Sequence, residues 1–176
     1  MKIVFLDIDG VLNSDRSFVA MAGKDLGREG DGYITRITVT TIDPIAVGIL
    51  NKILHQCDAH FVLSSSHRMN FDRGDDEVAI PEMKEYLARL GIDVSRCLGR
   101  TPILHTSRGS EIAIWLENNK FNYVVDSFVI LDDHADMLPE QQENFVRTNP
   151  TIGLTAENYR EACRILGSPD NQPVFL

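Results

Sequence analysis

The sequence has 176 residues, of which 43% are hydrophobic and 24% are charged, and these values are typical of a globular protein that buries a substantial core. Acidic residues outnumber basic ones by 26 to 17, so the formal net charge is −9, which argues against a protein that coats nucleic acid with a basic surface. No run of about 18 or more apolar residues occurs, so the sequence predicts no membrane-spanning helix.

The N-terminal residues and the cysteines bear on the compartment. Two aspartates interrupt the short N-terminal apolar run, so we expect no signal peptide. Cys57, Cys97 and Cys163 have neither the spacing of a metal site nor that of a disulfide framework. They predict three reduced thiols in the core of a cytoplasmic protein.

Strand and helix patterns alternate along the chain. Continuous apolar runs predict buried strands, and helical periodicity between capping residues predicts helices. In chain order, we expect a strand at 2–6, a helix beginning at Asp43, a strand at 60–63, a helix at 81–90, a weaker strand at 93–98, a helix beginning at Ser107 or Ser110, a strand at 123–131, a weaker strand at 144–147 and a helix at 155–166. This alternation predicts an α/β fold, with an open parallel sheet that carries helices on both faces, in one domain over 1–176.

The segment at about 14–41 breaks the alternation, because it is far longer than an ordinary connection between a strand and a helix. Glycines crowd its middle, and the β-branched residues at 33–40 predict a strand. We interpret the segment as a small flap or cap over the carboxyl edge of the sheet. Residues 70–77 predict a second mobile loop at the same edge, and long loops there are often lids.

Polar residues follow three of the predicted strands. Asp7, Asp9 and Gly10 follow the first, Ser64 and Ser65 follow the second, and an Asp-Asp pair, Asp132 and Asp133, follows the third. Open parallel sheets bind ligands at the carboxyl ends of their strands, so we expect these side chains to form one site.

The carboxylates at these strand ends favour a metal. Asp7 and Asp9 leave an extended segment on the same side, so their charges repel and a divalent cation would relieve the repulsion. Such a cluster of oxygen ligands suits Mg²⁺. Either pair alone could be a solvated turn or a helix N-cap, but their joint occurrence behind apolar strands favours the metal site.

Hydroxyl and guanidinium groups near the same edge predict a phosphate site. Ser64 or Ser65 can hold a phosphate oxygen, Arg68 can donate a bidentate hydrogen bond, and Gly10 lets the backbone approach a ligand. Arg108 lies near a predicted helix N-terminus, where the helix dipole disfavours a cation, and this favours a functional role. No G-x-S-x-G motif supports a serine hydrolase.

Four other side chains near these motifs have plainer interpretations. We interpret His67 and His134 as hydrogen-bonded structural side chains. We expect Trp115 and Phe121 to lie in the core.

Four segments resemble the motifs of the haloacid dehalogenase (HAD) superfamily, in their usual order: FLDIDGVLN, VLSSSHR, RGSEIAIWL and VILDDHADM. The resemblance is closest to a small phage and bacterial branch akin to the HAD domains of RNA-repair-type phosphatases, in which a tail like TIGLTAEN at 151–158 recurs. It implies a Rossmann-like, HAD-like fold.

The resemblance also implies roles for individual residues. Asp7 would attack phosphorus, and Asp9 would protonate the leaving oxygen and then activate water, while its backbone carbonyl touches Mg²⁺. Ser64 would bind the phosphoryl group, and Arg108 stands where the family carries a Lys or Arg that stabilises the transition state.

The Asp-Asp pair that follows the third predicted strand completes the implied metal site. Asp132 would ligate Mg²⁺, and Asp133 would ligate it or position a bound water.

These observations predict a Mg²⁺-dependent phosphatase that hydrolyses a phosphomonoester through an aspartyl-phosphate. The substrate is a nucleotide, another small phosphate or a nucleic-acid end, as in a polynucleotide 3′-phosphatase of repair. The alternative from another class is a non-catalytic phosphate-binding regulatory module. We expect no membrane partner, and the oligomeric state is not readable from the sequence.

Overall fold

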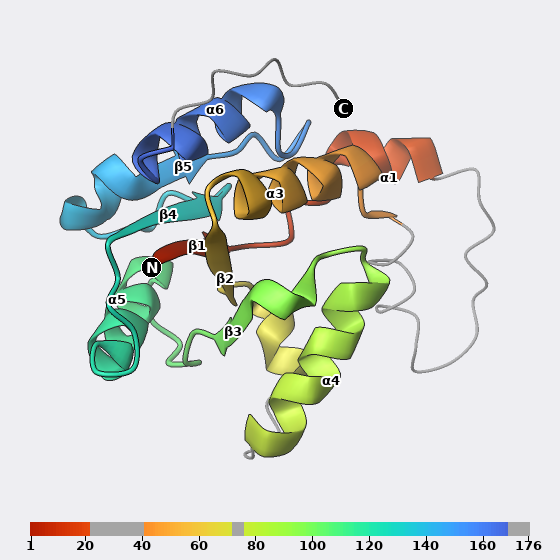
Figure 1. The fold of residues 1–176 in the computed structure, drawn as a ribbon. Helices are drawn as coiled ribbons and strands as arrows, with labels where there is room; N and C mark the ends of the chain where they lie inside the picture. Colours follow the sequence, from red (N-terminus) through yellow and green to blue (C-terminus); the bar gives the residue numbers. More distant parts are fainter. Residues whose placement is uncertain (22–40, 72–75, 169–176) are drawn as a thin grey trace.

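The computed structural model describes residues 1–21, 41–71 and 76–168, and its strands form one five-stranded parallel sheet (Figure 1). The strands are β1 (Lys2–Leu6), β2 (Ala59–Leu63), β3 (Cys97–Arg100), β4 (Ser127–Asp132) and β5 (Phe145–Arg147). Their order across the sheet is β3-β2-β1-β4-β5. The expected α/β fold with an open parallel sheet is therefore confirmed.

Helices connect the strands. They are α1 (Asp15–Met21), α3 (Pro44–Gln56), α4 (Asp76–Arg89), α5 (Arg108–Asn119) and α6 (Ala156–Ile165), with 3₁₀ helices at Ser66–Phe71, Val94–Arg96 and Pro139–Asn144. Capping residues set the starts of three of them. Asp43 accepts a hydrogen bond from the amide of Ile45, Ser107 accepts one from the amide of Ser110, and Thr155 forms a capping box with Asn158.

Both faces of the sheet are buried, because side chains alternate along each strand. Val4 and Leu6 of β1 belong to a core cluster with residues of α3, α4 and α6. Ile3 and Phe5 point the other way, into a smaller cluster that contains Trp115 of α5. Figure 1 shows α3 and α6 on one side of the sheet and α5 on the other. Helices therefore cover both faces, as predicted.

The register of the central strands positions the functional side chains. Leu6, the last residue of β1, lies opposite Leu63 of β2 on one side and Leu131 of β4 on the other. The polar residues that end or follow these three strands are consequently level with one another. The chain reverses its direction across the sheet at β1, and such a switch point is where open α/β sheets bind ligands.

Three elements begin several residues away from their predicted starts. β3 begins at Cys97 rather than at 93, because residues 94–96 form a 3₁₀ helix that Asp93 caps. β4 begins at Ser127 rather than at 123, since the preceding residues contact the N-terminus, whose amino group pairs with Asp126. α4 begins at Asp76, so residues 76 and 77 are helical rather than part of the loop expected at 70–77, and residues 70 and 71 end a 3₁₀ helix. Acidic side chains in the first turn favour this start, and Pro81 lies inside the helix. Residues 72–75 lie outside the described residues.

The segment expected as a flap is described only at its ends. Its first residues form α1, a helix that the sequence did not predict. Residues 22–40, with the strand expected at 33–40, lie outside the described residues.

Side-chain burial tests the remaining core assignments. Trp115 is buried against Phe5, as expected, whereas Phe121 is 90% exposed and the core prediction for it was wrong. Phe121 follows the end of α5, where the chain turns at the surface. The three cysteines are buried, as expected of core thiols, and Sγ of Cys57 lies 3.3 Å from Sγ of Cys163. In the part of the chain that the structure describes, no helix is long and apolar enough to cross a bilayer.

Candidate active site

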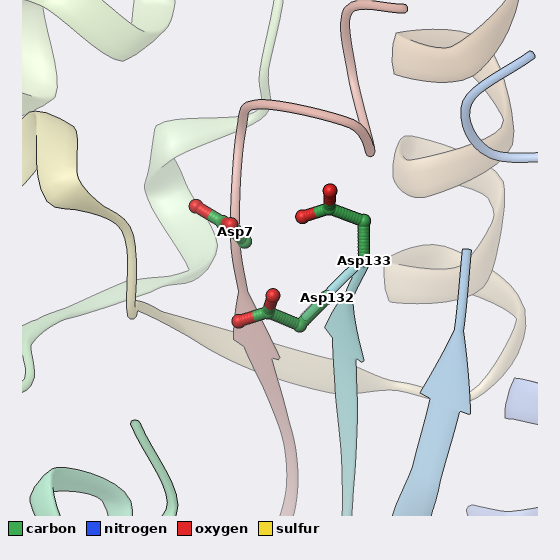
Figure 2. A group of neighbouring side chains, drawn as sticks. All are labelled: Asp7, Asp132 and Asp133. Atoms are coloured by element: carbon green, nitrogen blue, oxygen red, sulfur yellow. The ribbon is translucent and has the colours of Figure 1, made fainter. Parts of the chain in front are cut away.

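Three carboxylates gather at the carboxyl edge of the sheet. Asp7 follows β1, Asp132 ends β4 and Asp133 follows it, and Figure 2 shows their side chains side by side above these strands. One oxygen of each lies within 4.8 Å of the other two. Asp7 and Asp132 are almost fully buried, with 7% and 1% of their side chains exposed. The sequence predicted this meeting, and the structure brings these residues together.

Gly10 makes room for this cluster. Its φ of +70° lies in the left-handed region, and a Cβ built at this position would lie 2.5 Å from Cγ of Asp133. The backbone around Gly10 is also held, because its amide donates to Asn13 and its carbonyl accepts from Thr148. Close packing against Asp133 therefore explains why residue 10 is a glycine, and the substrate contact expected for it stays a prediction.

The cluster carries an electrostatic cost that a cation would relieve. Burial raises the pKa of Asp7, and the guanidinium of Arg108 offsets part of that rise. Burial, followed by the negative charge of Asp7, raises the pKa of Asp132 to about 7. Three carboxylates this close, two of them buried, form a donor set that suits a hard divalent cation such as Mg²⁺.

Arg108 is the cation at the cluster. Its Nε lies 3.2 Å from Oδ2 of Asp132, and its Nη2 lies 3.9 Å from Oδ2 of Asp7. The backbone amide of Arg108 donates to Asp136, which anchors the first turn of α5. These carboxylates explain why an arginine stands at a helix N-terminus, where the dipole alone disfavours it.

The two serines that follow β2 face different neighbours. Ser65 forms a side-chain hydrogen bond with Asp7. Ser64 lies beside Thr101, whose hydroxyl donates to it over 3.4 Å. Both serines are buried, with at most 1% exposed. Of the two candidates that the sequence left open, Ser65 is therefore the one in contact with Asp7.

Arg68 is engaged by the protein's own groups. It pairs with Glu111 of α5, and its Nη1 donates to the carbonyl of Ser65 over 2.6 Å. The side chains of Arg68 and Glu111 are only 2% and 5% exposed. The pair ties the backbone around Ser65 to α5, and the contact of Arg68 with phosphate stays a prediction.

Asp9 stands apart from the other carboxylates. Its side chain is 56% exposed and is not a member of the three-carboxylate group found among the described residues. Its Oδ1 accepts from Asn13 over 2.7 Å, and its Oδ2 lies 3.0 Å from Nε2 of His67. The hydrogen bond from His67 is the main cause that lowers the pKa of Asp9.

Several of these contacts were not predicted. Asn13 and His67 lie within the quoted motif segments, so their spacing from Asp9 and Ser65 could have drawn attention to them. Glu111 lies three residues after Arg108, on the next turn of α5. Asp136 likewise lies within the last motif segment. Tyr86, which contacts His67, comes from α4, and nothing in the sequence pairs these two residues.

Two hollows lie near this edge. A small one of about 130 Å³ adjoins the cluster, and its lining includes Arg68, Arg108 and Asp136. A larger one of about 390 Å³ lies beside β3 and contains none of the clustered carboxylates. The lining of the smaller hollow also contains none of these carboxylates, and Arg108 is the side chain that it shares with the site.

Comparisons with known proteins bear on what this arrangement does. A search of curated proteins and a search of solved structures each found no match. A family described as the HAD domain in Swiss Army Knife RNA repair proteins matches residues 3–159, which include all five strands except the first residue of β1, and all the clustered side chains. The match confirms the resemblance to the HAD superfamily and its RNA-repair branch, and it supports a phosphatase or another hydrolase. By its sequence, its parallel sheet and its strand-end carboxylates, the chain belongs to the family of HAD domains in Swiss Army Knife RNA repair proteins.

Proposed function

We propose that the protein is a Mg²⁺-dependent phosphatase that hydrolyses a phosphomonoester through an aspartyl-phosphate intermediate. The observation that carries this proposal is the buried group of Asp7, Asp132 and Asp133 with Arg108 beside it. The proposal includes a single domain over 1–176 with a small flap or cap insertion at about 14–41. The three buried cysteines, which have no spacing of a disulfide framework, support a cytoplasmic location.

The donor set fits the metal. Asp7, Asp132 and Asp133 would hold Mg²⁺, with the backbone carbonyl of Asp9 as a further ligand. When bound, the ion would neutralise the clustered carboxylates and the negative charge of the substrate phosphate.

Asp7 is the nucleophile in this proposal. One of its oxygens accepts from the amide of Ile8, so the carboxylate is oriented, and the other faces Arg108. In the first step a carboxylate oxygen of Asp7 bonds to phosphorus, the ester P–O bond breaks, and Asp9 gives a proton to the leaving oxygen. In the second step water bonds to phosphorus, Asp9 takes the proton of that water, and the acyl-phosphate bond breaks to release phosphate and restore Asp7.

Other groups would hold the phosphoryl group in line. Ser65, or Ser64 beside it, donates a hydrogen bond from its hydroxyl to a phosphoryl oxygen. Arg108 stabilises the charge that develops in the transition state, because its guanidinium is already fixed next to Asp7.

The test is release of phosphate from a generic aryl phosphate. We expect turnover with Mg²⁺, none in excess EDTA, and a loss on the order of 1,000-fold or more in Asp7→Asn. The matched control is Asp58→Asn, which changes an exposed aspartate at the start of β2, on the opposite edge of the sheet, where a left-handed φ of 50° suits Asn. Full activity in Asp7→Asn would rule out the aspartyl-phosphate. If the unmodified protein bound a phosphorylated ligand tightly but did not hydrolyse it, a non-catalytic module would be favoured instead.

A nucleic-acid end is the substrate that the family description favours. Three observations argue against an extended contact with a nucleic-acid backbone. The net charge is −9, Arg68 pairs with Glu111, and Arg100 pairs with Asp76. A phosphorylated terminus would need only the local charges of the site. Equal molar panels of 3′-phosphorylated oligonucleotides and mononucleotides would separate the two substrate classes, since a terminal-phosphate enzyme should have the higher kcat/KM on oligonucleotides.

A further inference from the structure

The carboxylate of Asp9 is held from both sides. Nδ2 of Asn13 lies 2.7 Å from its Oδ1, and Nε2 of His67 lies 3.0 Å from its Oδ2. More than half of the Asp9 side chain is exposed, so without these two contacts it would be free to change rotamer. Its orientation therefore depends on its two neighbours.

His67 is itself fixed. Its side chain is only 10% exposed, and its Nδ1 lies 2.9 Å from the hydroxyl of Tyr86. Its backbone amide donates to Oγ of Ser65, the serine that contacts Asp7. Tyr86 in turn packs on Phe71, with ring centroids 5.5 Å apart.

The hydrogen-bond directions follow from the acceptors. Between its two proton transfers Asp9 is ionised and can only accept, so Nε2 of His67 donates to it. Nδ1 of a neutral imidazole then accepts the hydroxyl hydrogen of Tyr86. The chain of contacts thus runs from α4 through Tyr86 and His67 to Asp9.

We propose that His67, held by Tyr86, is a positioning residue that orients the carboxylate of Asp9 for proton transfer with the substrate. The inference rests on the proposed function, because it assigns Asp9 the proton transfers of that reaction. Misplacing a catalytic group by about 1 Å costs on the order of 100-fold in rate, so a fixed rotamer matters for the reaction.

The choice of substrate separates positioning from a general structural effect. Expulsion of an alkoxide needs a proton from Asp9, whereas para-nitrophenolate leaves with little help. The kcat/KM value reports steps up to and including departure of the leaving group, so it isolates this proton transfer. A loss confined to alkyl phosphates is therefore the signature of a disturbed Asp9.

The experiment compares kcat/KM for glycerol phosphate and para-nitrophenyl phosphate in His67→Leu, His67→Gln and Tyr86→Phe. In His67→Leu we expect a loss on the order of 10-fold to 100-fold with glycerol phosphate and less than about 3-fold with the aryl ester. Gln offers an amide donor at the position of Nε2, so His67→Gln should recover most of the loss. Tyr86→Phe should show the same selective loss, in smaller measure.

The control is His55→Leu, which removes a histidine that pairs with Asp93 far from the site. It should leave both substrates unchanged. Equal losses on the two substrates in His67→Gln and Tyr86→Phe, or no loss in any variant, would overturn the positioning role while leaving the phosphatase intact. No Mg²⁺-dependent turnover of either ester by the unmodified protein would instead refute the proposed function, and the positioning role with it.

Discussion

The charge on Asp132 is costly because this side chain is buried beside Asp7. Its pKa is raised to about 7, first by burial and then by the neighbouring carboxylate. Arg108 contacts both groups but does not cancel the effect. At the scale of the residue, a bound cation would therefore offset the electrostatic cost of ionising these buried carboxylates.

Substitution of Asp132 should change how stability depends on pH. In the metal-free protein the folded state keeps this proton up to a pH of about 7, whereas the unfolded chain loses it near pH ~4. The free energy of unfolding should therefore fall as the pH rises through this window. Asp132→Asn lacks this penalty, so in EDTA it should gain stability relative to the parent by about 3 kcal/mol between pH ~4.5 and pH ~8.

Denaturant unfolding at the two pH values measures this difference. The control is Asp126→Asn, which removes an exposed carboxyl. If the stability difference between Asp132→Asn and the parent were the same at both pH values, the pKa of the Asp132 carboxyl would not be raised in the folded state.

At the scale of elements, α5 is locked to the site from two directions. The pair of Arg68 and Glu111 joins it to the 3₁₀ helix after β2. On the other side Gly109 packs so closely on the turn before Pro139–Asn144 that a Cβ there would lie 2.5 Å from the amide of Leu138. These contacts decide where Arg108, the first residue of α5, points.

Breaking the buried pair should destabilise the fold strongly. Arg68→Met leaves the carboxylate of Glu111 buried without its partner, which costs about 3–5 kcal/mol. The double variant with Glu111→Leu removes both charges and should recover part of that loss. Chemical denaturation measures both.

An exposed pair provides the matched control. Arg89 and Glu85 on α4 are both more than 60% exposed, so Arg89→Met should cost less than about 1 kcal/mol. If Arg68→Met cost as little as Arg89→Met, the buried pair would not be what holds α5 in place.

At the scale of the whole molecule, the site joins the two central strands of the sheet. Asp7 follows β1, whereas Asp132 ends β4 and Asp133 follows it, and these two strands pair over Lys2–Leu6 and Ser127–Leu131. A cation bound there links segments about 125 residues apart in sequence, and it binds the folded chain in preference to the unfolded one.

Mg²⁺ should therefore stabilise the entire fold. At 100 times its dissociation constant it should add about 2.7 kcal/mol to the free energy of unfolding, and EDTA should abolish this gain. Thermal unfolding with and without Mg²⁺ measures it, with Asp132→Asn expected to lose most of the effect and Asp58→Asn to keep it. A Mg²⁺ shift of the same size in Asp132→Asn would place the ion elsewhere.

The sequence by itself determined the alternation of strands and helices, the parallel sheet and the meeting of Asp7 with Asp132 and Asp133. These features follow from local patterns, because an apolar run that ends in polar residues locates both a buried strand and the edge at which its ligands lie. The family motifs in that order carried the same information, and the family match confirms them.

Only the tertiary structure decided which groups surround these carboxylates. Tyr86 reaches His67 from a helix 19 residues further along the chain, and Arg68 finds Glu111 across 43 residues. The start of β4 likewise depends on the N-terminus, which lies 125 residues before Asp126. Such contacts depend on how elements pack rather than on local spacing, so no pattern within one segment predicts them, and they are the contacts that orient Asp9 and Arg108.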